Sequence, residues 1–87
     1  MPHYADPEFW HLYRNLPEDI RDLADKNYAL LKTTPTHPSL RFKKVKGQDG
    51  LWSVRVGRDY RALAVEVAGG LQWFWIGTHA EYDRMIG

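Results

Sequence analysis

The spacing of hydrophobic residues along the chain changes near Pro38. Before this residue, apolar side chains recur every three or four positions, which is typical of an amphipathic helix. After it, apolar and polar side chains alternate, which is typical of a strand with one buried face. The pattern therefore predicts helices followed by a β-sheet.

Two helices are predicted before this change. The first begins with Asp6 as its N-cap and Pro7 in its first turn, and it ends near Asn15. The second begins at Pro17, has acidic residues in its first turn, and continues to Lys32. The short link between them predicts an antiparallel helical hairpin.

Four strands are predicted after the change, at residues 40–46, 51–56, 60–67 and 71–78. Because the segments between them are short and contain glycine, neighbouring strands should be antiparallel and form a meander. In the second strand the apolar residues are expected to be buried, while Ser53 and Arg55 on the other face are expected to meet solvent. Residues 79–86 are expected to form a short helix capped by Thr78.

The first five residues are too few, and too close to a proline, to supply a proper first strand. The expected fold class is therefore α+β, with two N-terminal helices packed on a four-stranded antiparallel meander and a short C-terminal helix. With 87 residues, the chain is expected to form a single domain over residues 1–87. An unpaired sheet edge would favour a weak homodimer.

The amino-acid composition limits the cellular compartments in which the protein is expected. The sequence has no cysteine, which excludes disulfides and thiolate metal sites and favours a reducing compartment. The longest strongly apolar run, residues 71–77, is far shorter than the roughly 20 residues that a membrane span needs. The N-terminus also lacks the pattern of a signal peptide. We therefore expect a cytoplasmic protein with no membrane partner.

Charge is unevenly distributed, although the net formal charge is only +1. Residues 41–61 contain seven basic and two acidic residues. Such a segment suits a polyanion or an acidic protein partner, although a solvated sheet face can have the same composition. No phosphate-binding loop and no histidine pair with metal-ligand spacing occurs in the sequence, so no metal and no other cofactor is expected.

Several short segments, taken in order, carry a resemblance to a known family. They are Leu16-Pro17, His37-Pro38-Ser39-Leu40, Phe42-Lys43-Lys44, Gly50-Leu51-Trp52-Ser53-Val54-Arg55-Val56, Asp59-Tyr60-Arg61-Ala62-Leu63 and Trp75-Ile76-Gly77-Thr78-His79-Ala80-Glu81-Tyr82-Asp83. This order resembles the RelE/ParE superfamily of toxins from type II toxin–antitoxin modules, which include plasmid-stabilisation systems. The resemblance implies two helices packed on an antiparallel sheet. It also implies metal-independent cleavage of mRNA on the ribosome or, in another branch, poisoning of DNA gyrase.

The resemblance also implies roles for individual residues. His79 is the candidate proton-transfer group, since an imidazole can serve as acid or base at neutral pH. Arg55 and Arg61 are the candidates for stabilising charge on a phosphate. Tyr82 and Asp83 share the helical face of His79, where they would orient its ring or stack on a base. The residues expected to contact RNA are Arg41, Lys43, Lys44, Arg58, Tyr82 and Asp83.

Each of these assignments has a structural alternative. His79 also suits a hydrogen-bonded surface histidine, and Arg61 suits an ion pair with Asp59 or Glu66. The lysines suit an edge strand, where they discourage aggregation. The aromatic residues of the strands suit a hydrophobic core.

The expected function is that of a toxin with endoribonuclease activity, an mRNA interferase that acts on mRNA at the ribosome. A small acidic antitoxin is the expected protein partner, because it would cover the basic face by charge pairing. The alternatives are a binding-only toxin of the gyrase-poisoning branch and a non-toxic relic that only binds an antitoxin. A proton-transfer role for His79 separates the enzyme from both.

Overall fold

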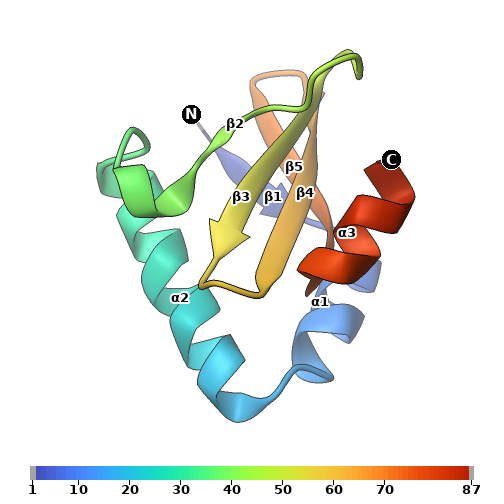
Figure 1. Ribbon diagram of the computed structural model, residues 1–87. Coiled ribbons are helices and arrows are strands. Elements are labelled where there is room, and N and C mark those ends of the chain that lie inside the picture. The colour runs from blue at the N-terminus through green and yellow to red at the C-terminus, as the bar shows by residue number, and fades with distance from the viewer. Residues whose placement is uncertain (1, 87) are drawn as a thin grey trace.

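The computed structural model describes residues 2–86, which form a five-stranded sheet with helices on both faces (Figure 1). In chain order the elements are β1 (His3–Ala5), α1 (Pro7–Arg14), α2 (Glu18–Thr33), a short 3-10 helix (Pro38–Leu40), β2 (Lys43–Lys44), β3 (Leu51–Val56), β4 (Tyr60–Val67), β5 (Gly70–Thr78) and α3 (His79–Ile86). The α+β class predicted from the sequence is confirmed.

The prediction that the N-terminus supplies no proper strand is wrong. The sheet order is β1-β5-β4-β3-β2, with β1 parallel to β5 and all other pairs antiparallel. Three residues suffice because the ladder is extended at both ends, where Leu71 donates to the Pro2 carbonyl and Asp6 donates to the Trp73 carbonyl. A side chain at Gly70 would collide with Pro2, so glycine permits this close approach. The sheet therefore has five strands instead of four.

The strand predicted at residues 40–46 is mostly not a strand, since only Lys43 and Lys44 pair with β3. Residues Pro38–Leu40 instead form a 3-10 turn, in which the His37 ring accepts a hydrogen bond from the Ser39 amide. Leu40 is fully buried in the core. Its burial draws the chain away from the sheet edge, and the alternating sequence pattern alone gives no sign of this.

The two N-terminal helices pack on one face of the sheet (Figure 1). The Asp6 side chain caps α1 by accepting a hydrogen bond from the Phe9 amide at 2.9 Å, as predicted. Helix α1 lies on β5 and α2 lies on β3, so the two helices rest on different strands of the same face. The main core lies beneath it and is built from Leu31, Leu40, Val54, Val56, Ala62, Ala64, Leu71, Trp73 and Ile76.

The other face of the sheet is also covered in part, because α3 packs against β4 and β5. On this face Leu63 pairs with Ser53 on one side and with Trp75 on the other. Ser53 is fully buried, so the prediction that it meets solvent is wrong, and its hydroxyl has no hydrogen-bond partner in the described part of the chain. Arg55, two residues further along the same face, is half-buried.

No helix within residues 2–86 has both the length and the apolar character that crossing a membrane requires.

Candidate functional site

Two arginines stand side by side on the face of the sheet that carries α3. Arg55 of β3 lies directly opposite Arg61 of β4, and Gly77 of β5 lies on the far side of Arg61. Arg55 donates a hydrogen bond from Nε to the Gly57 carbonyl at 3.0 Å. Within residues 2–86, neither guanidinium forms an ion pair with a carboxylate. Like charges opposite each other on neighbouring strands are unfavourable, so this pair favours the binding of an anion.

The guanidinium of Arg61 has unused hydrogen-bonding capacity. Its Nε and Nη1 atoms are buried and have no acceptor among residues 2–86. Its central carbon lies 5.1 Å from the centre of the Tyr82 ring, which supports the group from one side by a cation–π contact. The ion pairs considered for Arg61 from the sequence do not form, and Glu66 instead lies 3.6 Å from the Lys44 ammonium. Arg61 is thus oriented by stacking, and two of its donors remain buried without an acceptor within residues 2–86.

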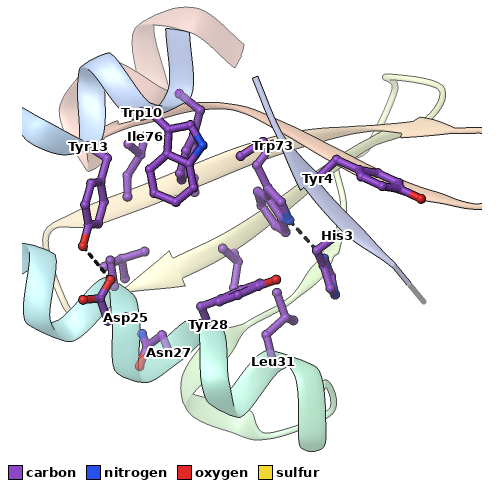
Figure 2. A pocket seen from close by; sticks show the side chains of 16 residues that line it. His3, Tyr4, Trp10, Tyr13, Asp25, Asn27, Tyr28, Leu31, Trp73 and Ile76 are labelled. Atoms are coloured by element: carbon purple, nitrogen blue, oxygen red, sulfur yellow. Dashed lines mark hydrogen bonds between the residues drawn. The ribbon is translucent and has the colours of Figure 1, made fainter. Parts of the chain in front are cut away.

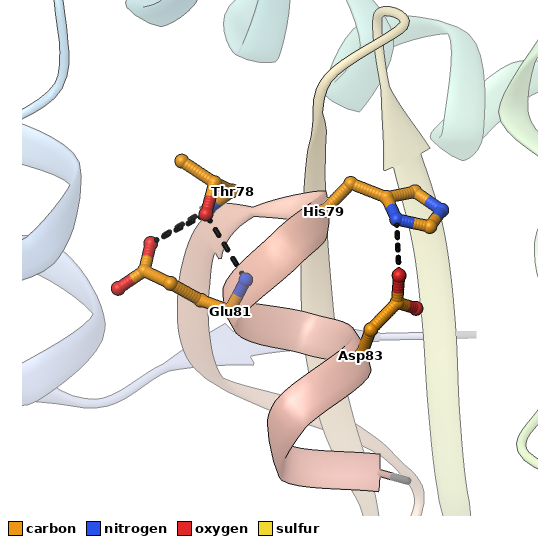
Figure 3. Close-up of polar contacts among 4 residues, drawn as sticks. All are labelled: Thr78, His79, Glu81 and Asp83. Atoms are coloured by element: carbon orange, nitrogen blue, oxygen red, sulfur yellow. Dashed lines mark hydrogen bonds and ion pairs between the residues drawn. The ribbon is translucent and has the colours of Figure 1, made fainter.

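His79 is the first residue of α3, and its ring centre lies 6.0 Å from that of Tyr82, the ring on which Arg61 stacks. Its backbone amide donates to the Asp59 carbonyl at 2.7 Å, which ties the start of α3 to the turn between β3 and β4. Its ring nitrogen Nδ1 is 3.0 Å from a carboxylate oxygen of Asp83, one helical turn later (Figure 3). Because a carboxylate only accepts hydrogen bonds, Nδ1 carries the hydrogen, and in the neutral ring Nε2 is the basic nitrogen.

The start of α3 is fixed by a reciprocal capping box (Figure 3). The Thr78 hydroxyl accepts from the Glu81 amide at 3.1 Å, while a Glu81 carboxylate oxygen accepts from the Thr78 amide at 3.0 Å. Glu81 was not singled out from the sequence, although Thr-x-x-Glu at the start of a helical segment is the signal for this motif. A side chain at Gly77 would collide with the Trp75 ring and meet Glu81, so glycine is needed for this close packing.

We expect Thr78→Ala to lower the free energy of unfolding by about 0.5–2 kcal/mol near neutral pH. Hydrogen bonds from the Thr78 backbone amide, and in second place from the Thr78 hydroxyl, lower the pKa of the Glu81 carboxyl, and the variant loses only the bond from the hydroxyl. A lowered carboxyl pKa stabilises the fold above the ordinary carboxyl range, and that contribution is lost as pH falls through the folded-state pKa. Urea unfolding at several pH values should therefore show that the part of the deficit due to the lost hydroxyl–carboxylate bond disappears in acid, whereas Thr36→Ala, in an exposed turn, should change little. A deficit that stays constant down to the pH of carboxyl protonation would contradict this role.

The remaining candidates fall on different faces of the sheet. Lys43 pairs with Ser53 and therefore lies on the face that carries Arg55. Lys44 pairs with Trp52 on the opposite face, where its ammonium lies 5.7 Å from the Trp52 ring centre. The structure therefore separates Lys44 from the arginine pair.

Two other basic candidates lie in links between elements. Arg58 is exposed in the turn between β3 and β4, next to Asp59. Arg41 is exposed and precedes β2, with φ of 44°, in the left-handed region. The structure thus brings together Arg55, Arg61, His79, Tyr82 and Asp83, with Lys43 further along the same face.

Within residues 2–86 no group of three or more histidine, aspartate or glutamate side chains is arranged to hold a metal ion.

A mixed five-stranded sheet, an N-terminal helical hairpin on one face and a C-terminal helix on the other define a small α+β domain. A comparison with protein families matches residues 18–84 to the ParE-like toxin domain. The chain therefore belongs to the ParE-like toxin domain family, within the RelE/ParE superfamily of toxins from toxin–antitoxin modules, and the resemblance noted in the sequence is confirmed.

Solved structures show the same fold. A chain of the RelB–RelE antitoxin–toxin complex from Methanococcus jannaschii is 15% identical, with a TM-score of 0.74 over 97% of this chain and 99% of that chain. The YoeB/ParE toxin from Agrobacterium tumefaciens is 19% identical, with a TM-score of 0.68 over 91% and 99%. A chain of the E. coli DinJ–YafQ toxin–antitoxin complex is 15% identical, with a TM-score of 0.72 over 92% and 93%. No curated protein matches the sequence.

Proposed function

We propose that this chain is a toxin that cleaves mRNA by a metal-independent reaction at the arginine pair. The observation that carries the proposal is that Arg55 and Arg61, without carboxylate partners in the described chain, share one sheet face and lie near His79, whose Nδ1 is held by Asp83. Two guanidiniums supply charge and donors for one phosphate, and the imidazole supplies proton transfer.

The proposed reaction needs only groups of the RNA, water and these side chains. His79 Nε2 takes the proton of a ribose 2′-hydroxyl, and the 2′-oxygen forms a bond to phosphorus while the bond from phosphorus to the 5′-oxygen breaks. The 5′-oxygen takes a proton from water as it leaves, so the products are a 2′,3′-cyclic phosphate and a 5′-hydroxyl. Arg55 and Arg61 stabilise the negative charge that builds on the phosphate oxygens.

Tyr82 has a supporting position in this reaction. Its ring is half-buried, packs under the Arg61 guanidinium and lies 6.0 Å from the His79 ring, centre to centre. A tyrosine in this place orients Arg61 and offers a ring on which an unpaired base can stack. Arg41, Lys43 and Arg58 extend the positive charge beside the site and would hold flanking phosphates.

The experiment that tests the proposal is expression of the chain in cells without antitoxin, with mapping of mRNA 5′ ends. Arrested growth with new mRNA ends that bear a 5′-hydroxyl would support cleavage. Arrest with intact mRNA would point to the gyrase-poisoning branch and contradict the enzyme. Normal growth with a folded and abundant protein would point to a relic.

The two adjacent lysines of β2 offer a matched test of which face binds RNA. We expect Lys43→Glu to weaken binding to single-stranded RNA and to reduce the slope of log affinity against log salt concentration by about one, because one phosphate contact is lost. Lys44→Glu makes the same charge change on the opposite face and should leave the slope unchanged. Fluorescence titrations at several salt concentrations measure both. Equal losses in the two variants would show that binding does not depend on this face.

We also propose a small acidic antitoxin as partner, since two of the similar structures are toxin–antitoxin complexes and this chain has a basic face. An antitoxin segment lying over Arg55 and Arg61 would pair with both guanidiniums and close the site. It would also raise the melting temperature of the chain by mass action, as would a weak homodimer through the open edge of β2.

A further inference from the structure

A cavity of about 190 Å³ lies between the helical hairpin and the sheet (Figure 2). It is lined by Val54 and Ala62, so it lies on the face opposite the arginine pair. Its floor is formed by core residues such as Val54 and Ile76, and its walls are aromatic. Figure 2 shows Trp10 and Tyr13 of α1 on one side and Tyr28 of α2 with Trp73 of β5 on the other. The cavity exists because α1 and α2 rest on different strands.

Exposed aromatic side chains lie at the rim of this cavity. Trp10 and Tyr28 both line it, and their exposed fractions are 44% and 43%. Exposed apolar side chains that gather in one place mark an interaction surface, and tryptophan and tyrosine are the residues most often found at energetic centres of protein interfaces. This arrangement suits a polypeptide that covers the rim better than it suits a small molecule enclosed in the cavity.

Charge is uneven along the cavity. At one end the Asp25 carboxylate accepts a hydrogen bond from the Tyr13 hydroxyl at 2.6 Å and, within residues 2–86, pairs with no basic side chain. This bond raises the pKa of Tyr13, so its hydroxyl remains a donor. At the other end the Lys32 ammonium lies 4.7 Å from the Tyr28 ring centre. The negative end therefore lies between Tyr13 and the helix that carries Asp25.

We propose that this cavity is a docking site for a polypeptide segment that inserts one arginine or lysine side chain beside Asp25 and covers the exposed aromatic rim with apolar neighbours. The aliphatic stem of such a side chain packs against aromatic walls while its charged end reaches the carboxylate. A basic segment is the complementary occupant at this end, because Asp25 is the acidic residue of the lining and pairs with no basic side chain within residues 2–86. An acidic segment, such as the antitoxin proposed for the opposite face, has the wrong charge for this site.

One residue of the cavity lining is hydrogen-bonded to the strand that carries Arg55. Asn27 lines the cavity and donates a hydrogen bond to the backbone carbonyl of Arg55 at 3.2 Å. The docking proposal does not rest on RNA cleavage, and its test is a binding measurement alone.

The test uses the full chain labelled for NMR and three probes, which are an acetylated and amidated leucine–arginine–leucine tripeptide, its leucine–glutamate–leucine counterpart, and acetylated arginine amide. We expect the arginine tripeptide at millimolar concentration to shift the indole signals of Trp10 and Trp73, and the glutamate tripeptide to bind at least roughly threefold more weakly. Absence of any shift with the arginine tripeptide would overturn the proposal, as would equal binding of the glutamate tripeptide. Equal binding of acetylated arginine amide would overturn the part played by the apolar rim.

A matched pair of variants locates the site. Asp25→Asn keeps an acceptor for Tyr13 and removes the charge, so it should weaken the arginine tripeptide about threefold to tenfold. Asp19→Asn removes a charge from the first turn of the same helix, away from the cavity lining, and should have less than roughly a twofold effect. Equal effects of the two would indicate general electrostatic attraction and overturn the assignment to Asp25. Dispersed amide signals in each spectrum check that the variants are folded.

Discussion

His79→Ala should reduce the rate of RNA cleavage by roughly 10²- to 10⁴-fold, the usual contribution of a positioned proton-transfer group. RNA affinity should change little, because the imidazole is one group beside several cations. Cleavage of a synthetic RNA at saturating protein measures the rate, and titration of a variant of that RNA with a 2′-deoxy residue at the cleavage site measures affinity. Growth arrest in cells should be lost together with the new mRNA ends.

His11→Ala is the control for this variant, since His11 is an exposed histidine on α1, outside the site. Asp83→Asn separates the role of the carboxylate from that of the ring. An amide in place of the carboxylate still accepts a hydrogen bond from Nδ1 but no longer stabilises the protonated ring, so the rate should fall less than in His79→Ala. Full activity of His79→Ala would exclude His79 as the proton-transfer group.

Arg61→Met should slow cleavage by roughly 10²- to 10³-fold while making the protein more stable. The loss of rate follows because one of two guanidiniums that stabilise the developing phosphate charge is removed. The gain in stability, about 1 kcal/mol, follows because Nε and Nη1 of Arg61 are buried without acceptors and methionine has no such atoms to leave unpaired. Urea unfolding and single-turnover cleavage measure the two effects on the same sample.

Arg14→Met is the control, since Arg14 is exposed at the end of α1 and its loss should change neither quantity appreciably. A decrease in the free energy of unfolding of Arg61→Met would mean that the guanidinium is satisfied in solution and is a structural residue. In that case the arginine pair would lose its main support as an anion site.

The regular part of the fold could be predicted from hydrophobic periodicity. Strands β3 and β4 have the predicted bounds, and the first residues of α1 follow from Asp6 and Pro7. The alternation of apolar and polar residues gave a wrong prediction at Leu40, because packing against the core places this residue outside the sheet. The same pattern also gave a wrong prediction at Ser53, because periodicity tells which residues share a face but not whether that face is covered.

The candidate site could be predicted in part. The sequence placed Arg55, Arg61 and His79 in elements that meet, but it did not show that Arg61 has buried donors without acceptors. Lys43 and Lys44 must lie on opposite faces of a strand, but only the register of β2 with β3 decides which of them shares the face of the arginine pair. The aromatic cavity depends on how far apart the two helices rest on the sheet, a quantity that no local pattern contains.

The parallel pairing of β1 with β5 has a consequence for the order in which the chain can be assembled. The Trp73 indole donates a hydrogen bond at 3.0 Å to the His3 ring, 70 positions away in the sequence. During synthesis the N-terminal residues leave the ribosome first, yet they have no sheet partner until β5 has also emerged. Closing so long a loop is entropically costly and slow, so β1 should be among the last elements to dock. A truncated chain that ends before β5 therefore cannot place its first strand, and the wall of the cavity that Trp73 provides is complete only in a chain translated at least through β5.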